Sequence, residues 1–512
     1  MADVVTSILF ESPAERARAE QGEVPACFAD LNLDQLVQAI TTDWAEYDLK
    51  PFFYVPLSRV AAIMHRQEVM RDLERPAVLD SIKAFAEKLR SVRAHLMQAG
   101  KLHYKRQKDA WHLDAVDIYC RAVTELADNL RASRPRSRGL VEFLEHLGQY
   151  IVASQFVSLA AEAKALGAIL ARIRYCVHVR GSSFTVSPYR SEPDYSAQVE
   201  ETFERFARSD VKDYRIKYTS SVSMNHIEAK ILEYVSELEP GVFSALDAFC
   251  ANNIDFMDAT TVTFDREIHF YIAYLHHITK FSCEGLPFCY PQISATEKSG
   301  HCTEGFDLAL ATRLGKTRQI VRNDFQLRDE ERIIVVTGPN QGGKTTFVRM
   351  FGQVLYLAGL GCPIPGRQAR LPLFDRIFTH FEREERTENL RGKLQDELVR
   401  IRAIYDQATS ASIIILNEIL TSTTLQDAMF LSWQIMEKII DLDALCAWVT
   451  FIDELAAPND RVVSMASTVD PQNPTLRTFK ILRRPPDGLA HAVSIAEKYQ
   501  LTYERLKERL SS

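Results

Sequence analysis

The stretch "IIVVTGPNQGGKTTF" (residues 333–347) decides the fold of the C-terminal part of the chain. An aliphatic run leads into a glycine-rich turn, and residues that suit a helix follow, so we predict a strand, a loop and a helix in that order. The turn carries the pattern G-x-x-x-x-G-K-[ST] from Gly338 to Thr345. In this context the pattern predicts a P-loop, which is a backbone cradle for phosphate groups.

Each residue type in this loop suits a part of phosphate binding. The glycines let the backbone fold around phosphate, and the N-terminus of the following helix adds a favourable dipole. Lys344 is expected to reach the β- and γ-phosphates, and the Thr345 hydroxyl is expected to ligate Mg²⁺. We therefore expect ATP and Mg²⁺ to be bound by Gly338, Pro339, Asn340, Gln341, Gly342, Gly343, Lys344, Thr345 and Thr346.

A second strand-like stretch, "SIIILNE" (412–418), ends in the polar pair Asn417–Glu418. Glu418 is the candidate general base or water-positioning group, and the alternative is a surface carboxylate at the end of a strand. Asn417 can accept a hydrogen bond from a Mg²⁺-bound water but brings no negative charge to offset the cation. We expect weaker metal retention and slow hydrolysis, with nucleotide binding preserved.

The regions on either side of residue 300 differ in pattern. Downstream, short aliphatic runs such as "LCAWVTFID" (445–453) alternate with helical segments, which predicts a parallel α/β sheet. Upstream, long amphipathic patterns predict helices over 79–100, 113–130, 140–172, 226–252 and 266–281. "NLDQLVQAI" predicts a helix capped by Asn32 with Gln35 as the reciprocal partner. "RYCVHVRGSSFTVSPY" (174–189) alternates around Gly181–Ser182 and predicts a β-hairpin.

Composition indicates a globular protein, with 46% hydrophobic residues and a net charge of −7. This charge gives no global attraction to polyanions, so DNA contact would need local basic patches such as "RASRPRSRG" (131–139), which could equally be solvated loop. We find no signal peptide and no membrane-spanning run, and the scattered cysteines favour reduced thiols in the cytoplasm. The histidines and cysteines between 276 and 302 match no zinc-binding spacing.

The loop "TGPNQGGKTT" (337–346) resembles that of the DNA mismatch repair protein family MutS, TGPNMGGKST. Further segments resemble the family at 47–74, 361–381, 449–455 and 486–501. The resemblance implies a P-loop NTPase domain of the ABC/MutS type, preceded by a mostly helical core or lever domain with a small β-hairpin insertion. It places an N-terminal extension at 1–44, the helical core at 45–290 with a reduced clamp around 174–220, and the ATPase domain with a C-terminal helical dimerisation segment at 291–512.

Departures from the family pattern limit what the resemblance implies. The core-like segment begins near residue 45, so we expect the family's mismatch-reading and connector domains to be missing. The signature-loop serine falls on Gly392, flanked by Arg391 and Lys393, and the switch histidine falls on Phe451. Lys393 could contact the γ-phosphate bound by a partner subunit as a point charge, or belong to a solvated charged helix.

Three functions remain open on this basis. The first is a homodimeric ATPase that hydrolyses ATP slowly and contacts DNA through its backbone or structure rather than a mismatch. The second is a nucleotide-gated binding module with little hydrolysis. The third is a protein-remodelling or signalling ATPase that does not bind DNA.

Overall fold

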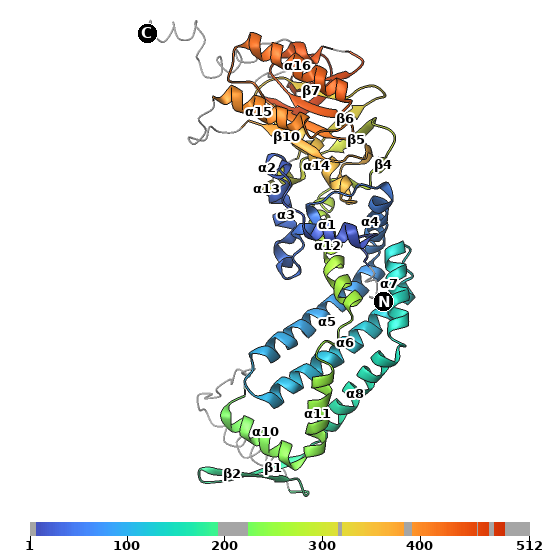
Figure 1. The fold of residues 1–512 in the computed structure, drawn as a ribbon, viewed down its shortest axis with the longest axis vertical. Coiled ribbons are helices and arrows are strands. Elements are labelled where there is room, and N and C mark those ends of the chain that lie inside the picture. The colour runs from blue at the N-terminus through green and yellow to red at the C-terminus, as the bar shows by residue number, and fades with distance from the viewer. Residues whose placement is uncertain are drawn as a thin grey trace, which may run out of the picture. The chain divides into compact units, whose positions relative to one another are not determined.

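The computed structural model describes residues 7–192, 224–315, 320–382, 392–457, 459–470 and 476–486. The chain divides into two compact units (Figure 1). Within the described residues, unit 1 contains Arg75–Pro135 and Val141–Asp265, and unit 2 contains Ser7–Glu74, Arg136–Leu140 and the residues from Arg266 onward. These divisions do not coincide with the predicted boundaries after residues 44 and 290, and the predicted domains stay predictions.

Unit 1 is mainly helical, and its helix α5 (Pro76–Lys101) matches the helix predicted over 79–100. Pro76 occupies the first turn, where its missing N–H has no intrahelical partner to lose. Its apolar stripe is buried at Ile82, Phe85, Leu89 and Val92, as the amphipathic pattern of this segment requires. α5 packs along α6 (Lys105–Ser133), which covers the helix predicted over 113–130.

Two of the predicted helices are each two helices in the structure. The pattern over 140–172 divides into α7 (Arg138–Tyr150) and α8 (Ser154–Leu170). The pattern over 226–252 divides into α10 (His226–Leu238) and α11 (Pro240–Asn252), because Pro240 cannot donate the hydrogen bond that a continuous helix needs there. The prediction of one continuous helix over each of these two ranges was therefore wrong. The helix predicted over 266–281 lies within α12 (Ala259–Ser282).

The predicted β-hairpin is confirmed as β1 (Tyr175–Arg180) and β2 (Ser183–Pro188), which pair antiparallel with Arg180 opposite Ser183. Gly181 has a φ of 61° in the two-residue turn, a conformation that glycine adopts without strain. The rest of the predicted clamp, from 193 to 220, lies outside the described residues.

Unit 2 begins with short helices that precede the sheet region. They are α1 (Pro13–Glu20), α2 (Cys27–Leu31), α3 (Leu33–Thr41), η1 (Thr42–Tyr47), η2 (Lys50–Phe53) and α4 (Val60–Leu73). Asn32 does precede α3, but its side chain makes no capping bond, so the predicted capping box is wrong. Asn32 also ends α2 in the left-handed conformation, with a φ of 56°, instead of the extended conformation that N-cap residues usually adopt.

The main sheet of unit 2 has the strand order β10-β11-β12-β7-β13-β14. Its strands are β7 (Ile333–Thr337), β10 (Ile377–Phe381), β11 (Ile413–Asn417), β12 (Leu445–Val449), β13 (Val462–Val469) and β14 (Arg477–Arg483). All neighbouring pairs are parallel except β13 and β14, so the predicted parallel α/β sheet is confirmed. Smaller sheets comprise β3 (Phe288–Cys289), β4 (Gln292–Ser294), β5 (Gly300–Gly305), β6 (Asn323–Leu327), β8 (Ile364–Pro365) and β9 (Gln368–Pro372).

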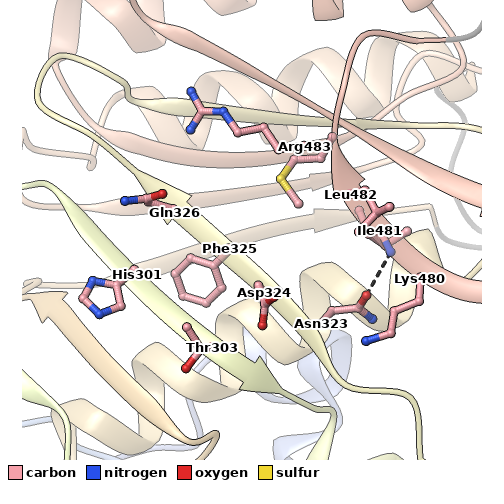
Figure 2. Close-up of a pocket in the computed structure, with 11 residues that line it drawn as sticks. His301, Thr303, Asn323, Asp324, Phe325, Gln326, Lys480, Ile481, Leu482 and Arg483 are labelled. Carbon is pink, nitrogen blue, oxygen red and sulfur yellow. Dashed lines mark hydrogen bonds between the residues drawn. The ribbon is translucent and has the colours of Figure 1, made fainter.

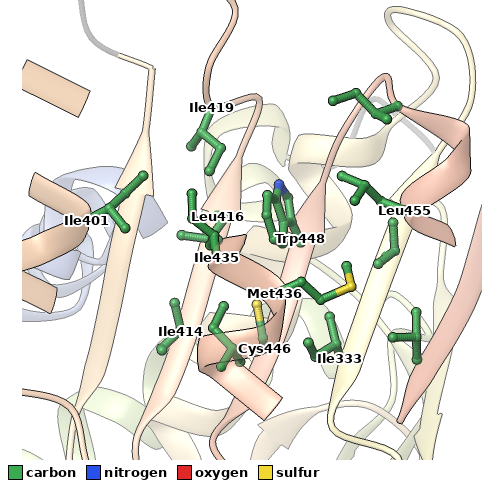
Figure 3. Close-up of a cluster of buried hydrophobic side chains, with 14 of the residues drawn as sticks. Ile333, Ile401, Ile414, Leu416, Ile419, Ile435, Met436, Cys446, Trp448 and Leu455 are labelled. Carbon is green, nitrogen blue, oxygen red and sulfur yellow. The ribbon is translucent and has the colours of Figure 1, made fainter. Parts of the chain in front are cut away.

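Helices cover both faces of the main sheet. On one face, Ile414 and Leu416 of β11 join a core with α15 (Lys393–Tyr405) and α16 (Leu425–Leu442) (Figure 3). On the other face lies α14 (Lys344–Gly359), where a Cβ added at Gly352 would be 2.8 Å from the Ile415 side chain. Unit 2 also contains α13 (Leu308–Leu314), η4 (Asp453–Ala456) and the part of α12 from Arg266 onward. The parallel strands have their carboxyl ends at the same edge of the sheet, and both faces of the sheet are buried. Polar groups that follow the strands therefore collect at this edge.

Candidate functional site

The glycine-rich loop lies between β7 and α14, in the predicted order of strand, loop and helix. Gly338, Gln341 and Gly343 have φ values of 118°, 58° and 92°. A Cβ added at Gly338 would lie 2.9 Å from the Ser467 Cβ, and one added at Gly342 would lie 2.3 Å from the Ser467 hydroxyl. The loop therefore needs glycine for its backbone conformation and for its close approach to β13.

Ser467 of β13 supports the loop directly. Its side chain is buried, and its hydroxyl donates a hydrogen bond to the Gly342 carbonyl at 2.8 Å. This contact could not be predicted from the sequence, because a serine within an apolar strand fits no binding motif.

Lys344, the first residue of α14, has its ammonium group surrounded by groups of its own chain. Nζ donates to the carbonyls of Gly338 at 2.9 Å and Pro339 at 3.2 Å. Nζ also lies 3.7 Å from a Glu418 carboxylate oxygen and 4.5 Å from the centre of the Phe451 ring. Burial lowers the pKa of Lys344, while the nearby Glu418 carboxylate opposes that shift.

Thr345, in the first turn of α14, meets Asn417, at the end of β11, although β12 lies between β11 and β7 in the sheet. The Thr345 hydroxyl donates to the Asn417 Oδ1 at 3.0 Å. Asn417 is the last residue of β11 and is buried. Two oxygen atoms therefore face each other at the carboxyl edge of the sheet, as the roles predicted for these residues require.

This oxygen pair fits a magnesium ion. The Thr345 hydroxyl directs its O–H at the Asn417 Oδ1, which leaves a lone pair on the hydroxyl oxygen for the ion and leaves the amide oxygen able to accept from a Mg²⁺-bound water. Neutral amide and hydroxyl oxygens are hard ligands of the kind that Mg²⁺ accepts, but they supply no charge. The residues present thus fit the ion in geometry while attracting it less than a carboxylate would.

Glu418 follows Asn417 with a φ of 53°, in a backbone region that few residues other than glycine adopt. Its N–H donates to the Val449 carbonyl at 3.0 Å, which fixes the turn at the end of β11. Leu420 also has a positive φ, of 60°, and its N–H donates to the Glu397 carboxylate at 3.0 Å. Strained residues that the surrounding structure holds in place are concentrated at functional sites, and this turn has two of them.

The predicted signature loop is described only in part. Gly392 precedes α15, Lys393 is its first residue, and Arg391 lies outside the described residues. The Lys393 ammonium is 2.6 Å from the Glu382 carboxylate of the same chain, and its hydrogen bond lowers the pKa of Glu382. Glu382 also accepts a hydrogen bond from Thr421 at 3.3 Å, so Lys393 is joined to the loop that follows β11.

The remaining predicted loop residues occupy the turn itself. Asn340 and Gln341 are exposed, Pro339 is buried and Thr346 is partly buried in the first turn of α14. The Asn340 Oδ1 lies at 3.5 Å from the Lys344 ammonium. The structure thus brings together the loop, Asn417 and Glu418, which the sequence placed far apart along the chain.

A separate groove of about 440 Å³ lies in unit 2 between β5, β6 and β14 (Figure 2). Its lining includes His301, Thr303 and Asp324 but none of the predicted site residues. At one end, the Asn323 side chain accepts from the Ile481 N–H at 2.8 Å and donates to the Phe479 carbonyl at 3.1 Å. The groove therefore borders β14 without being the predicted phosphate site.

Comparison with known proteins identifies the region that contains the site. Residues 334–502 match the family described as MutS domain V. A DNA mismatch repair protein MutS from Thermotoga neapolitana is 35% identical over 139 residues, which cover 27% of this chain and 17% of that protein. A relative of the same name from Chlorobaculum tepidum is 28% identical over 221 residues, covering 40% of this chain and 25% of that protein.

A longer match reaches upstream of the main sheet. A DNA mismatch repair protein MutS from Chlorobium phaeovibrioides is 26% identical over 296 residues, which cover 56% of this chain and 33% of that protein. Across these matches the chain spans between 17% and 33% of the relatives' own length. The resemblance to the MutS family is confirmed, and the matched region contains the glycine-rich loop, Asn417 and Glu418.

The described ranges contain neither a metal-binding cluster of His, Cys, Asp and Glu side chains nor a helix that could span a membrane. Within them, no cluster of three or more His, Cys, Asp or Glu side chains is arranged to hold a metal ion. No described helix is both long enough and apolar enough to cross a bilayer.

Proposed function

We propose that unit 2 binds ATP with Mg²⁺ and hydrolyses it slowly. The observation that carries the proposal is the meeting of the Lys344 ammonium, the Thr345–Asn417 oxygen pair and the Glu418 carboxylate at one edge of the sheet. The order of β7, glycine-rich loop and α14 supports a P-loop, since it aims a helix N-terminus and loop backbone at a common point.

Each of these side chains has a distinct role in the proposed reaction. Lys344 neutralises charge on the β- and γ-phosphates, and Thr345 with Asn417 holds the ion, Asn417 through a bound water. Glu418 orients the attacking water and accepts its proton. Mg²⁺ supplies charge neutralisation at the phosphates when it is bound.

Slow hydrolysis is expected for two physical reasons. Asn417 adds no negative charge beside the ion, so the ion is held less tightly. Glu418 lies 3.7 Å from the Lys344 ammonium, and this contact competes with the orientation that the carboxylate needs to position a water.

Steady-state phosphate release by the purified full chain tests this proposal. Glu418→Gln should reduce turnover by about a hundredfold or more while ATP binding is kept, because a general base contributes roughly 10²–10⁴-fold. Lys344→Ala should weaken ATP binding itself. Equal phosphate release by the parent and both variants would show that another protein or another site is responsible.

A second candidate is a nucleotide-gated binding module that scarcely hydrolyses ATP. The neutral Asn417 favours this alternative, because it reduces metal retention without disturbing the loop. Both candidates predict ATP binding, and they differ in turnover.

We further propose that the protein acts as a homodimer in the cytoplasm and that ATP binds between the ATPase domains of the two subunits. Nucleotide binding is proposed to change how tightly the protein binds DNA. Support comes from the relatives, whose names describe DNA mismatch repair, and from the resemblance that implies pairing of the ATPase domains. A trans role for Lys393 would require its ion pair with Glu382 to open. A protein-remodelling function without DNA remains the third candidate, and the acidic net charge favours it.

A further inference from the structure

Phe451 occupies a position where its ring can control access to Lys344. It follows β12, and its neighbours Thr450 and Ile452 are both buried, whereas 49% of Phe451 is exposed. Thr450 donates its N–H to the Val336 carbonyl at 3.1 Å, and its hydroxyl accepts from the Ile452 N–H at 3.1 Å. The backbone on either side of the ring is therefore fixed against the sheet.

The ring covers an ammonium group that is otherwise enclosed by polar atoms. Its centre is 4.5 Å from Nζ, within the range of a cation–π interaction. Only 3% of the Lys344 side chain is exposed, although the loop around it reaches the surface. Glu418, Asp453 and Arg477 contribute the other charges near Nζ, so an aromatic face completes the group's surroundings.

We propose that Phe451 is a lid residue on Lys344, which the phosphates of an incoming nucleotide must displace. This inference rests on the proposed function, because it concerns regulation of the same site. Phosphate and the ring compete for one ammonium group, so ATP binding breaks the cation–π contact. The free energy of that contact is thereby lost from the free energy of ATP binding, and the affinity for ATP is lower. The ring thereby slows the entry of ATP and raises the ATP concentration at which half of the sites are occupied.

Two ring variants separate this role from a general effect on packing. Phe451→Ala removes the ring and should bind ATP faster and about fivefold more tightly, the equivalent of a cation–π contact of about 1 kcal/mol. Phe451→Tyr keeps an aromatic face and should match the parent. Phe430→Ala removes a comparably exposed aromatic side chain from α16 and is the control, with unchanged ATP affinity expected.

A second measurement reports on the lid without any nucleotide. Acylation of Lys344 by an activated ester, followed by mass spectrometry of its peptide, measures access to the ammonium group. Phe451→Ala should accelerate acylation of Lys344 relative to Lys298, which pairs with Asp443 and serves as the internal reference. Phe451→Tyr should leave this ratio unchanged.

The two measurements distinguish the failure of the lid from the failure of the proposed function. Faster acylation with tighter ATP binding in Phe451→Ala supports the lid. Equal acylation in Phe451→Ala and the parent overturns it, as does weaker ATP binding in that variant, which would make the ring a part of the binding surface. If the parent and Lys344→Ala both fail to bind ATP, the proposed function is contradicted, and the lid proposal, which rests on it, is contradicted as well.

Discussion

Asn417 is the residue that most affects how fast the proposed site can work. Its Oδ1 accepts the Thr345 hydroxyl at 3.0 Å, so the amide fills the position where a carboxylate could also accept that bond. Asparagine and aspartate have nearly the same shape, and their exchange changes mainly the charge beside the ion. The geometry of the site is therefore compatible with either residue.

Asn417→Asp should lower the Mg²⁺ concentration needed for half-maximal phosphate release and raise turnover, because it adds a negative charge beside the cation. Titration of Mg²⁺ in a phosphate-release assay measures both quantities. Asn417→Ala, which removes the oxygen, is the control and should lose Mg²⁺ dependence together with activity. A slower Asn417→Asp enzyme would show instead that the site is adapted to a neutral ligand.

At the scale of elements, the β7–loop–α14 segment depends on close contact with β13. A Cβ at Gly342 would be 2.8 Å from the Pro339 carbonyl oxygen as well as 2.3 Å from the Ser467 hydroxyl. The first of these neighbours is backbone, so the loop itself would have to move.

Gly342→Ala should therefore weaken ATP binding and lower the free energy of unfolding of unit 2 by about 1–3 kcal/mol, the usual cost of overpacking. The matched control is Gly167→Ala within α8, where an added Cβ meets nothing within 4 Å. That variant should stabilise its helix by about 0.5–1 kcal/mol, since alanine loses less backbone entropy than glycine, and leave ATP affinity unchanged. Denaturant unfolding and isothermal titration calorimetry check the pair, and a Gly342→Ala protein that binds ATP like the parent would contradict the argument.

The elements also show which features of the fold could be predicted from the sequence. Aliphatic runs gave β7, β11 and β12, because strands buried on both faces need continuous apolar residues. Periodicity did not reveal the break between α10 and α11, because the apolar pattern continues through Pro240 while its backbone cannot donate. The capping box at Asn32 failed because two helices share that residue.

The candidate site likewise contains residues that could be predicted from the sequence and contacts that could not. Lys344, Thr345 and Glu418 could be predicted because their chemistry is local to a motif at the end of a strand. The contacts of Ser467 with Gly342 and of Glu397 with Leu420 join residues distant in sequence, and no short pattern encodes such pairs. The ring of Phe451 over Lys344 likewise depends on how β12 lies beside β7.

At the scale of the whole molecule, the net charge limits where on its surface the protein could bind DNA. The chain has 61 lysines and arginines against 68 aspartates and glutamates, so any DNA contact must be local. Within the predicted basic stretch, Arg131 pairs with Asp128, and Arg138 forms an ion pair with Glu11. Arg134 and Arg136 are the other arginines there, and both are exposed.

If the basic stretch binds DNA, affinity should fall steeply as salt rises, because each neutralised phosphate releases counterions. Fluorescence anisotropy with duplex, branched and single-stranded DNA over a salt series measures the slope. The double variant Arg134→Glu and Arg136→Glu should weaken binding to every DNA and reduce the slope by about 2 for duplex DNA, roughly 0.9 per lost contact. Arg121→Glu on α6, where Arg121 pairs with Asp117, is the control for a charge reversal outside the basic stretch. Binding that persists unchanged in the double variant would place the DNA surface elsewhere, and no binding at low salt would favour a protein-remodelling ATPase, because phosphate contacts are strongest there.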